Sequence, residues 1–118
     1  MRIFVIDSDP QTASVVESTF AREHEIVSTT SGFAAIERIA IGRAFDVILC
    51  DLEMPDLSGK EIYRRLLESA PQTASKVVFL VSDPKAHRAC LDGLQNHYVQ
   101  RPVAAAVLRE TIRAMSLR

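Results

Sequence analysis

The sequence predicts a doubly wound α/β domain, in which helices cover both faces of a parallel sheet. Short β-rich runs alternate along the chain with segments whose apolar residues recur at helical spacing. Two runs, Asp46–Cys50 and Val77–Val81, are almost wholly apolar, as expected of central strands buried on both faces. A chain of 118 residues is the size of one domain, so we expect a single domain over residues 1–118.

The strands follow one another at regular intervals, each ended by turn residues. We expect them at Ile3–Ile6, Glu25–Ser28, Asp46–Cys50, Val77–Val81 and Tyr98–Gln100, the second at an edge of the sheet. We expect helices after Asp9, from Ser31 to near Gly42, over Gly59–Ser69, over Lys85–Leu94 and at the end of the chain.

The helices are predicted from their caps and their apolar faces. Asp9 before Pro10 suits an N-cap followed by proline at the first helical position. The residues expected to face the core are Ala13, Val16 and Phe20 in the first helix, Ile36, Ile39 and Ala40 in the second, Ile62 and Leu66 in the third, and Leu108, Ile112 and Met115 in the last.

Composition and charge exclude several classes of protein. Apolar residues make up 47% of the chain, charged residues 25%, and the formal net charge is −1. No basic stripe is present to neutralise a nucleic-acid backbone, and no apolar run is long enough to span a bilayer. Cys50 and Cys90 form neither a CxxC pair nor a disulfide framework, which favours the cytoplasm.

Polar side chains gather where the predicted strands end. They are Asp7, Ser8 and Asp9 after the first strand, Asp51 and Glu53 after the third, Ser82 and Asp83 after the fourth, and Arg101 after the fifth. Doubly wound sheets bind ligands beyond these ends of their strands. Carboxylates there suit Mg²⁺, while a hydroxyl and a fixed cation suit phosphoryl oxygens.

Each of these residues also has a purely structural interpretation. Asp9 and Asp83 are expected to be helix caps or turn formers, Ser82 alone suits a cap, and Arg101 alone suits a surface charge. Asp51 differs, because a carboxylate that directly follows a buried strand needs compensation for its lost hydration. The joint arrangement favours a functional site.

The segment Asp46–Gly59, which contains Asp51, Met54, Pro55 and Gly59, resembles the phosphoacceptor strand and loop of bacterial response-regulator receiver domains. The resemblance covers essentially the whole chain, including the acidic cluster, the hydroxyl and the basic-Pro pair. It implies a flavodoxin-like fold with strand order 2-1-3-4-5.

The resemblance also implies roles for individual residues. Asp51 would take a phosphoryl group from a histidine kinase or phosphotransfer protein. Ser82 and Arg101 would contact that group, Arg101-Pro102 would match a pair usually joined by a cis peptide bond, and Tyr98 would be the aromatic switch.

Mg²⁺ is the cofactor that the family implies. Asp7 and Asp51 would hold it together with the backbone carbonyl of Glu53. Ser8 stands where the family usually has a further acid, and a neutral hydroxyl is a poorer ligand for a hard dication. We therefore expect weakened Mg²⁺ binding.

Two other departures concern the region after the fourth strand. Arg101 replaces a lysine, and its guanidinium could clasp a phosphoryl group or pair permanently with Asp51. The stretch from Ser82 to Arg101 is about three residues short of the family norm, which removes roughly one helical turn. The usual Gly-Ala before the last strand is also missing. We expect an altered signalling face.

The leading hypothesis is a receiver that acts as a binding switch rather than an enzyme. Its partners would be a kinase or phosphotransfer protein and a downstream protein or output domain, with a homodimer also open. The alternative is a pseudo-receiver, an interaction module that is never phosphorylated. A small phosphatase or flavin protein fits less well, because the chain has no glycine-rich phosphate loop and no Trp. His24, His87 and His97 are expected away from the cleft.

Overall fold

The computed structural model describes residues 1–88 and 98–116. Its sheet is parallel, with strand order β2-β1-β3-β4-β5, which confirms the predicted order. The strands are β1 (Arg2–Ile6), β2 (Glu25–Thr29), β3 (Val47–Asp51), β4 (Val77–Val81) and β5 (Tyr98–Gln100). The helices are α1 (Pro10–Phe20), α2 (Gly32–Ile41), α3 (Gly59–Ser69), α4 (Pro71–Ala74) and α6 (Ala105–Ser116).

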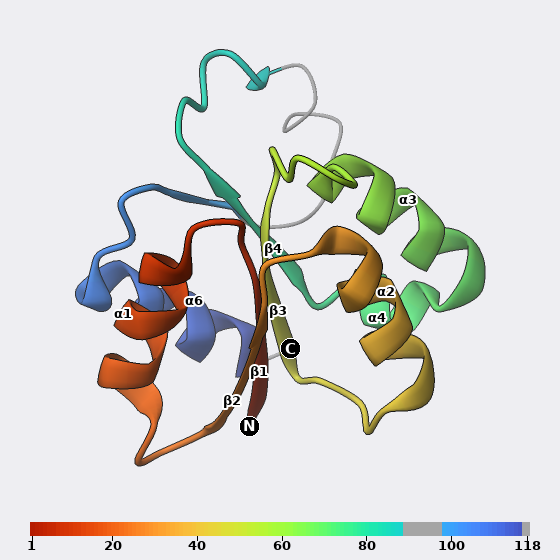
Figure 1. The fold of residues 1–118 in the computed structure, drawn as a ribbon. Coiled ribbons are helices and arrows are strands. Elements are labelled where there is room, and N and C mark those ends of the chain that lie inside the picture. Colours follow the sequence, from red (N-terminus) through yellow and green to blue (C-terminus); the bar gives the residue numbers. More distant parts are fainter. Residues whose placement is uncertain (89–97, 117–118) are drawn as a thin grey trace.

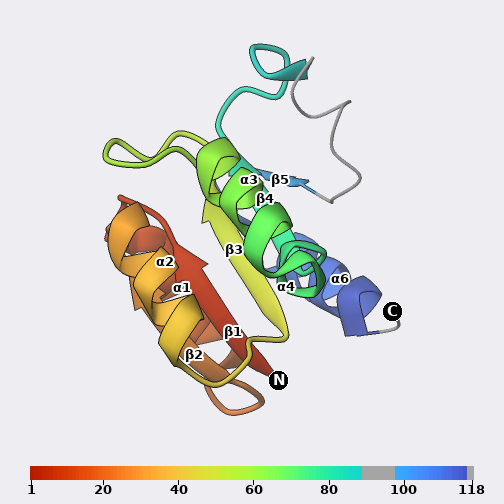
Figure 2. The same cartoon turned by 90° about the vertical axis from the view of Figure 1, so that its right-hand side faces the viewer.

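The helices form one layer on each face of the sheet. Helices α1 and α6 cover one face, and α2, α3 and the short α4 cover the other (Figures 1 and 2). Successive strand residues point to opposite faces, so each central strand contributes to both cores. On β3, for example, Ile48 packs on the side of α3, whereas Leu49 packs on the side of α6. All residues of β3 and β4 are buried, while β2 at the edge is half-exposed.

Side-chain caps begin three of the helices. Asp9 accepts a hydrogen bond from the Gln11 N–H (3.0 Å) with Pro10 at the first helical position, as predicted. Ser31 caps α2 and Ser58 caps α3 in the same way. The predicted inward faces of α1, α3 and α6 are confirmed, with Ala13 only partly buried.

One prediction about the helices was wrong, and one helix was missed. Ala40 does not face the core but is exposed; Ala35 takes that place, because it lies in the same stripe as Gly32, Ile36 and Ile39. The short helix α4 was not predicted.

The helix predicted over Lys85–Leu94 falls largely outside the described residues. Pro84–His87 form turns, and Gly93, Leu94 and Gln95, where the family's Gly-Ala is missing, are not described, nor are Cys90 and His97. No helix in the described part of the chain is long and apolar enough to cross a membrane.

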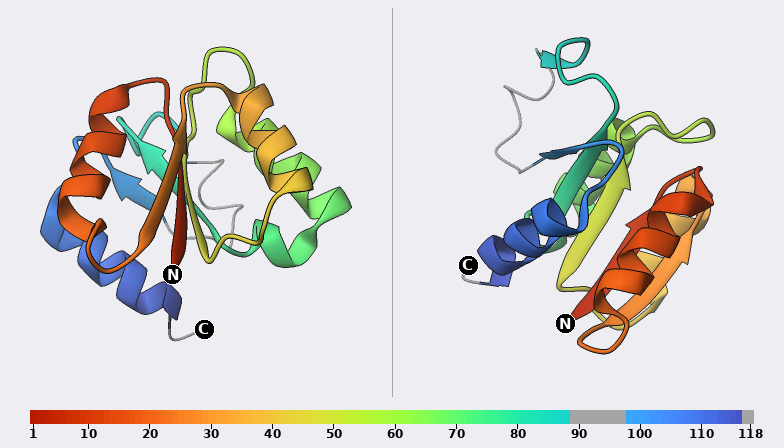
Figure 3. Two further views of the ribbon diagram at one scale, coloured as in Figure 1. Left: turned by 60° about the horizontal axis from the view of Figure 1, so that its bottom comes forward. Right: turned by 90° about the vertical axis from the view of Figure 1, so that its left-hand side faces the viewer.

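The parallel register brings the carboxyl ends of all strands to one edge of the sheet (Figure 3). Ile6 is level with Cys50, Asp51 with Leu80, and Val81 with Gln100. The residue that follows each strand therefore lies at the same edge as its neighbours.

Hydrogen bonds hold the loop after β3 against the first turn of α2. The Asp56 carboxylate accepts hydrogen bonds from the Ser31 hydroxyl (2.8 Å) and from the N–H groups of Gly32 (3.0 Å) and Phe33 (3.3 Å). A Cβ on Gly32 would lie 2.7 Å from the Leu57 carbonyl oxygen, so the helix and the loop are in direct contact. Hydrogen bonds from these backbone N–H groups and from Ser31 lower the pKa of Asp56 to about 2.

We expect Asp56→Asn to lower stability at neutral pH but to lose this effect in acid. The pKa of Asp56 is depressed in the folded state, so its stabilising effect is complete above its ordinary pKa of 3.8 and is lost as the pH falls toward 2. Melting temperatures of both proteins, measured between pH 6 and 2, should converge below about pH 4. Other acids titrate in both proteins and cancel in the difference. A gap that stays constant over this range would contradict the assignment.

Candidate functional site

The residues at the carboxyl edge of the sheet continue its hydrogen bonding beyond the strands. The Asp7 N–H donates to the Thr29 carbonyl oxygen (3.2 Å), and the Arg101 N–H donates to that of Val81 (2.8 Å). Asp51 is itself the last residue of β3. Because their backbones belong to the sheet, the positions of Asp7, Asp51 and Arg101 are set by rigid elements and not by loose loops.

Asp7 is a buried carboxylate with protein partners on both of its oxygens. It is 2% exposed. Its Oδ1 accepts the Asp9 N–H (2.9 Å), and its Oδ2 accepts the Thr12 hydroxyl (2.7 Å). These bonds offset the cost of burying the charge and fix the orientation of the carboxylate.

Asp51 is also buried, at 3% exposed, but has fewer partners. Its Oδ1 accepts the Glu53 N–H (3.0 Å), and its Oδ2 faces the Arg101 guanidinium. Burial raises the pKa of Asp51 above its ordinary value, and the nearby Asp7 carboxylate raises it further, while the Glu53 N–H and Arg101 oppose the rise. Two neighbouring buried carboxylates repel each other when both are ionised, so a nearby positive charge stabilises them.

Arg101 supplies positive charge to three acids at once. Its guanidinium nitrogens lie 3.5 Å from Asp51 Oδ2, 3.5 Å from Asp7 Oδ2 and 3.4 Å from Asp9 Oδ2. The bond between Arg101 and Pro102 is a cis peptide, as the family resemblance implies. The sequence predicted two alternative roles for Arg101, binding a phosphoryl group or pairing with Asp51, and the structure shows the pairing with Asp51. The contact of Arg101 with Asp9 was not predicted.

The loop after Asp51 is held closely against the end of β3. The Gly59 N–H donates to the Leu52 carbonyl oxygen (3.0 Å). A Cβ on Gly59 would lie 2.5 Å from the Asp51 carbonyl oxygen and 2.8 Å from the Leu52 Cα, so any side chain there would push on the backbone of Asp51 itself. Gly59 is required for this close approach.

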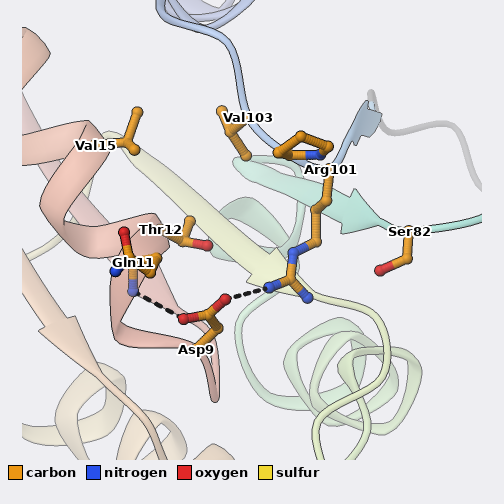
Figure 4. A pocket seen from close by; sticks show the side chains of 8 residues that line it. Asp9, Gln11, Thr12, Val15, Ser82, Arg101 and Val103 are labelled. Carbon is orange, nitrogen blue, oxygen red and sulfur yellow. Dashed lines mark hydrogen bonds and ion pairs between the residues drawn. The ribbon is translucent and has the colours of Figure 1, made fainter.

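A pocket of about 530 Å³ lies beside the acidic cluster (Figure 4). Arg101 and Ser82 line it from the strand ends, and Gln11, Thr12 and Val15 line it from α1. In Figure 4 the Arg101 guanidinium lies between Asp9 and Ser82. The pocket gives a ligand a route to the guanidinium.

The remaining predicted site residues differ in their placement. Ser82 is exposed at the pocket, and Tyr98 is 49% exposed on β5. Ser8 is exposed, while its neighbour Asp7 is buried. Asp83 accepts a hydrogen bond from the Lys85 N–H (3.1 Å), the local capping role predicted for it.

The prediction that His87 lies away from the cleft was wrong. Its Nε2 contacts Oε1 of Glu53, in the loop that follows Asp51. No local sequence pattern predicts this pairing, because the two residues belong to different loops. His24 lies elsewhere, near the N-terminus of β1.

The oxygen donors at the cleft suit a hard divalent cation, although they are few. Asp7 and Asp51 offer carboxylates, the ligand type that Mg²⁺ prefers. Across residues 1–88 and 98–116, no group of three His, Cys, Asp or Glu side chains is arranged to hold a metal ion. The carboxylate of Asp9 is engaged by the Gln11 N–H and by Arg101.

Comparison with known proteins agrees with this architecture. The model of the response regulator receiver domain family matches residues 3–113. Transcriptional regulatory protein CutR of Streptomyces coelicolor is 26% identical over 119 residues, covering 100% of this chain and 54% of CutR. Sensory/regulatory protein RpfC of Xanthomonas campestris is 25% identical over 116 residues, covering 95% of this chain and 16% of RpfC.

Solved structures share the fold. The receiver domain of a sensor histidine kinase from Pseudomonas aeruginosa PAO1 is 21% identical, with a TM-score of 0.82 over 98% of this chain and 97% of that one. That structure has a magnesium ion coordinated in its active site cleft. The chain spans only part of the length of the curated relatives. With the strand order and a family match over residues 3–113, this chain belongs to the response regulator receiver domain family.

Proposed function

We propose that Asp51 accepts a phosphoryl group from a phosphohistidine on a histidine kinase or a phosphotransfer protein. The observation that carries this proposal is the orientation of the Asp51 carboxylate at the end of a central strand. The Glu53 N–H holds its Oδ1, while its Oδ2 faces the cleft and the cation of Arg101. One oxygen is thus positioned and the other is directed toward the cleft.

The reaction exchanges one bond to phosphorus for another. Asp51 Oδ2 attacks phosphorus and forms the acyl phosphate, the P–N bond to the imidazole breaks, and the nitrogen of the leaving imidazole regains its electron pair. Arg101 would bind the phosphoryl oxygens and Ser82 would donate its hydroxyl to them, a proposal supported by the presence of both residues at the same pocket.

Mg²⁺ in such a site neutralises charge on the transferring phosphoryl group. Asp7, Asp51 and the backbone carbonyl of Glu53 would hold it here. We expect weak binding, because Ser8 supplies no carboxylate and lies exposed.

The module would work in the cytoplasm as a binding switch, not as an enzyme acting on a separate substrate. Phosphorylation of Asp51 would change the surface presented to a downstream protein or output domain, with Tyr98 on β5 as the responding aromatic residue. A homodimer is one form such a partner could take. Direct binding to nucleic acid is not part of this proposal, because the net charge is −1.

We expect acetyl phosphate with millimolar Mg²⁺ to add one phosphoryl group to the protein, and Asp51→Asn to abolish the addition. Asp46→Asn is the matched control, since Asp46 precedes the same strand at its opposite end and bonds the Arg2 N–H (2.6 Å). Intact-protein mass spectrometry measures the addition. Without labelling by acetyl phosphate or by a kinase, the phosphoacceptor role would fail and a pseudo-receiver would be the better description.

We expect Ser8→Asp to tighten Mg²⁺ binding by about tenfold or more, because it restores a carboxylate where the family has one. Ser18→Asp adds the same charge at an exposed position further along α1 and should have little effect. Calorimetric titration gives both affinities. Equal effects of the two substitutions would show that residue 8 is no ligand.

A further inference from the structure

The guanidinium of Arg101 contacts the two buried carboxylates, Asp7 and Asp51, that would hold a metal ion. Backbone N–H groups occupy the Oδ1 atoms of both buried acids, with Asp9 donating to Asp7 and Glu53 donating to Asp51. The Oδ2 atoms of Asp7 and Asp51 each lie 3.5 Å from a nitrogen of Arg101, and Asp7 Oδ2 also accepts the Thr12 hydroxyl (2.7 Å). Arg101 therefore lies directly beside the two carboxylates, Asp7 and Asp51, that would hold a divalent cation.

Asp9 also contacts Arg101, at the same nitrogen, Nη2, that lies near Asp7. Its Oδ1 caps α1 through the Gln11 N–H, and its Oδ2 lies 3.4 Å from Arg101 (Figure 4). The two oxygens of one side chain thus tie the guanidinium to the first turn of a helix. An exposed ion pair of this kind is weak by itself, but it restrains a side chain that already has two buried partners.

We propose that Arg101 is a tethered competitor of the divalent cation, with Asp9 as the positioning residue that holds it over Asp7 and Asp51. Mg²⁺ binding then requires the guanidinium to move away from the two carboxylates, and the displaced Arg101 becomes available to a phosphoryl group. The proposal deepens the function proposed above and rests on it. It makes residue 101, as well as Ser8, a determinant of metal affinity.

The arrangement depends on arginine and not merely on positive charge. A guanidinium presents several N–H donors in a planar fork and can contact three carboxylates at once. A lysine ammonium concentrates its three donors at one point on a flexible stem, so it holds the same three partners less firmly than the planar fork does. Arg101→Lys therefore keeps the net charge while weakening the bridge, which separates competition from long-range electrostatics.

The test is a calorimetric Mg²⁺ titration of the whole chain without any phosphodonor. We expect Arg101→Lys to bind Mg²⁺ about tenfold more tightly than the natural sequence, and Arg101→Gln at least as tightly as Arg101→Lys. Arg113→Gln removes one positive charge from a 75% exposed side chain at the end of α6 and should change affinity less than about twofold. Equal affinities for the natural protein and Arg101→Lys would overturn the proposal, as would no binding by any variant.

Asp9→Asn tests whether Asp9 holds Arg101 in place, because the two possible effects of the substitution change Mg²⁺ affinity in opposite directions. Asparagine can still cap α1, but it no longer pairs as an anion with Arg101. Loss of an acidic charge alone would weaken Mg²⁺ binding, whereas release of the competitor would tighten it. We expect tighter binding; weaker binding would overturn the role of Asp9.

Thermal melting provides a second readout that does not depend on phosphorylation. Because ligand binding stabilises the folded state, Mg²⁺ should raise the melting temperature of Arg101→Lys more than that of the natural protein. Neither measurement uses labelling of Asp51, so failure of phosphorylation and failure of this competition are distinguishable. An equal rise in both proteins would count against the proposal.

Discussion

The pairing of β1 with β3 is the constraint on which the rest of this structure depends. It places the buried carboxylates of Asp7 and Asp51 next to each other at the end of the sheet. Two anions in a poorly hydrated position repel each other and need positive charge, which Arg101 supplies from the end of β5. The hydrogen bonds of Thr12, Asp9 and Glu53 then fix which oxygens face the cation.

Most of the fold could be predicted from the sequence, because its signals are local. The apolar runs of β3 and β4 marked central strands, and the Asp9-Pro10 pair marked the start of α1. The placement of Ala40 failed because a small apolar residue carries little information about which side of a helix faces the core. The single turn of α4 is too short to show a periodic pattern.

The sequence could predict which site residues lie at the ends of the strands, but not all of the contacts that their side chains make. That Asp7, Asp51 and Arg101 meet follows from parallel strands, which the alternating pattern indicated. The capping role of Asp9 was visible in its neighbours, but its second contact is with a residue 92 positions away and depends on the path of the Arg101 side chain. The contact of His87 with Glu53 likewise joins two loops whose relative position no local pattern specifies.

The close packing at Gly59 has a consequence for how mutations in this domain should be interpreted. The start of α3 touches the backbone of Asp51, so added bulk there would move the carboxylate without altering any charged or hydrogen-bonding group. A side chain at position 59 would therefore disturb the cleft although all of its charged residues remain in the sequence. Loss of function from a substitution at Gly59 need not signify a lost binding partner, because displacement of Asp51 through its own main chain would produce the same phenotype.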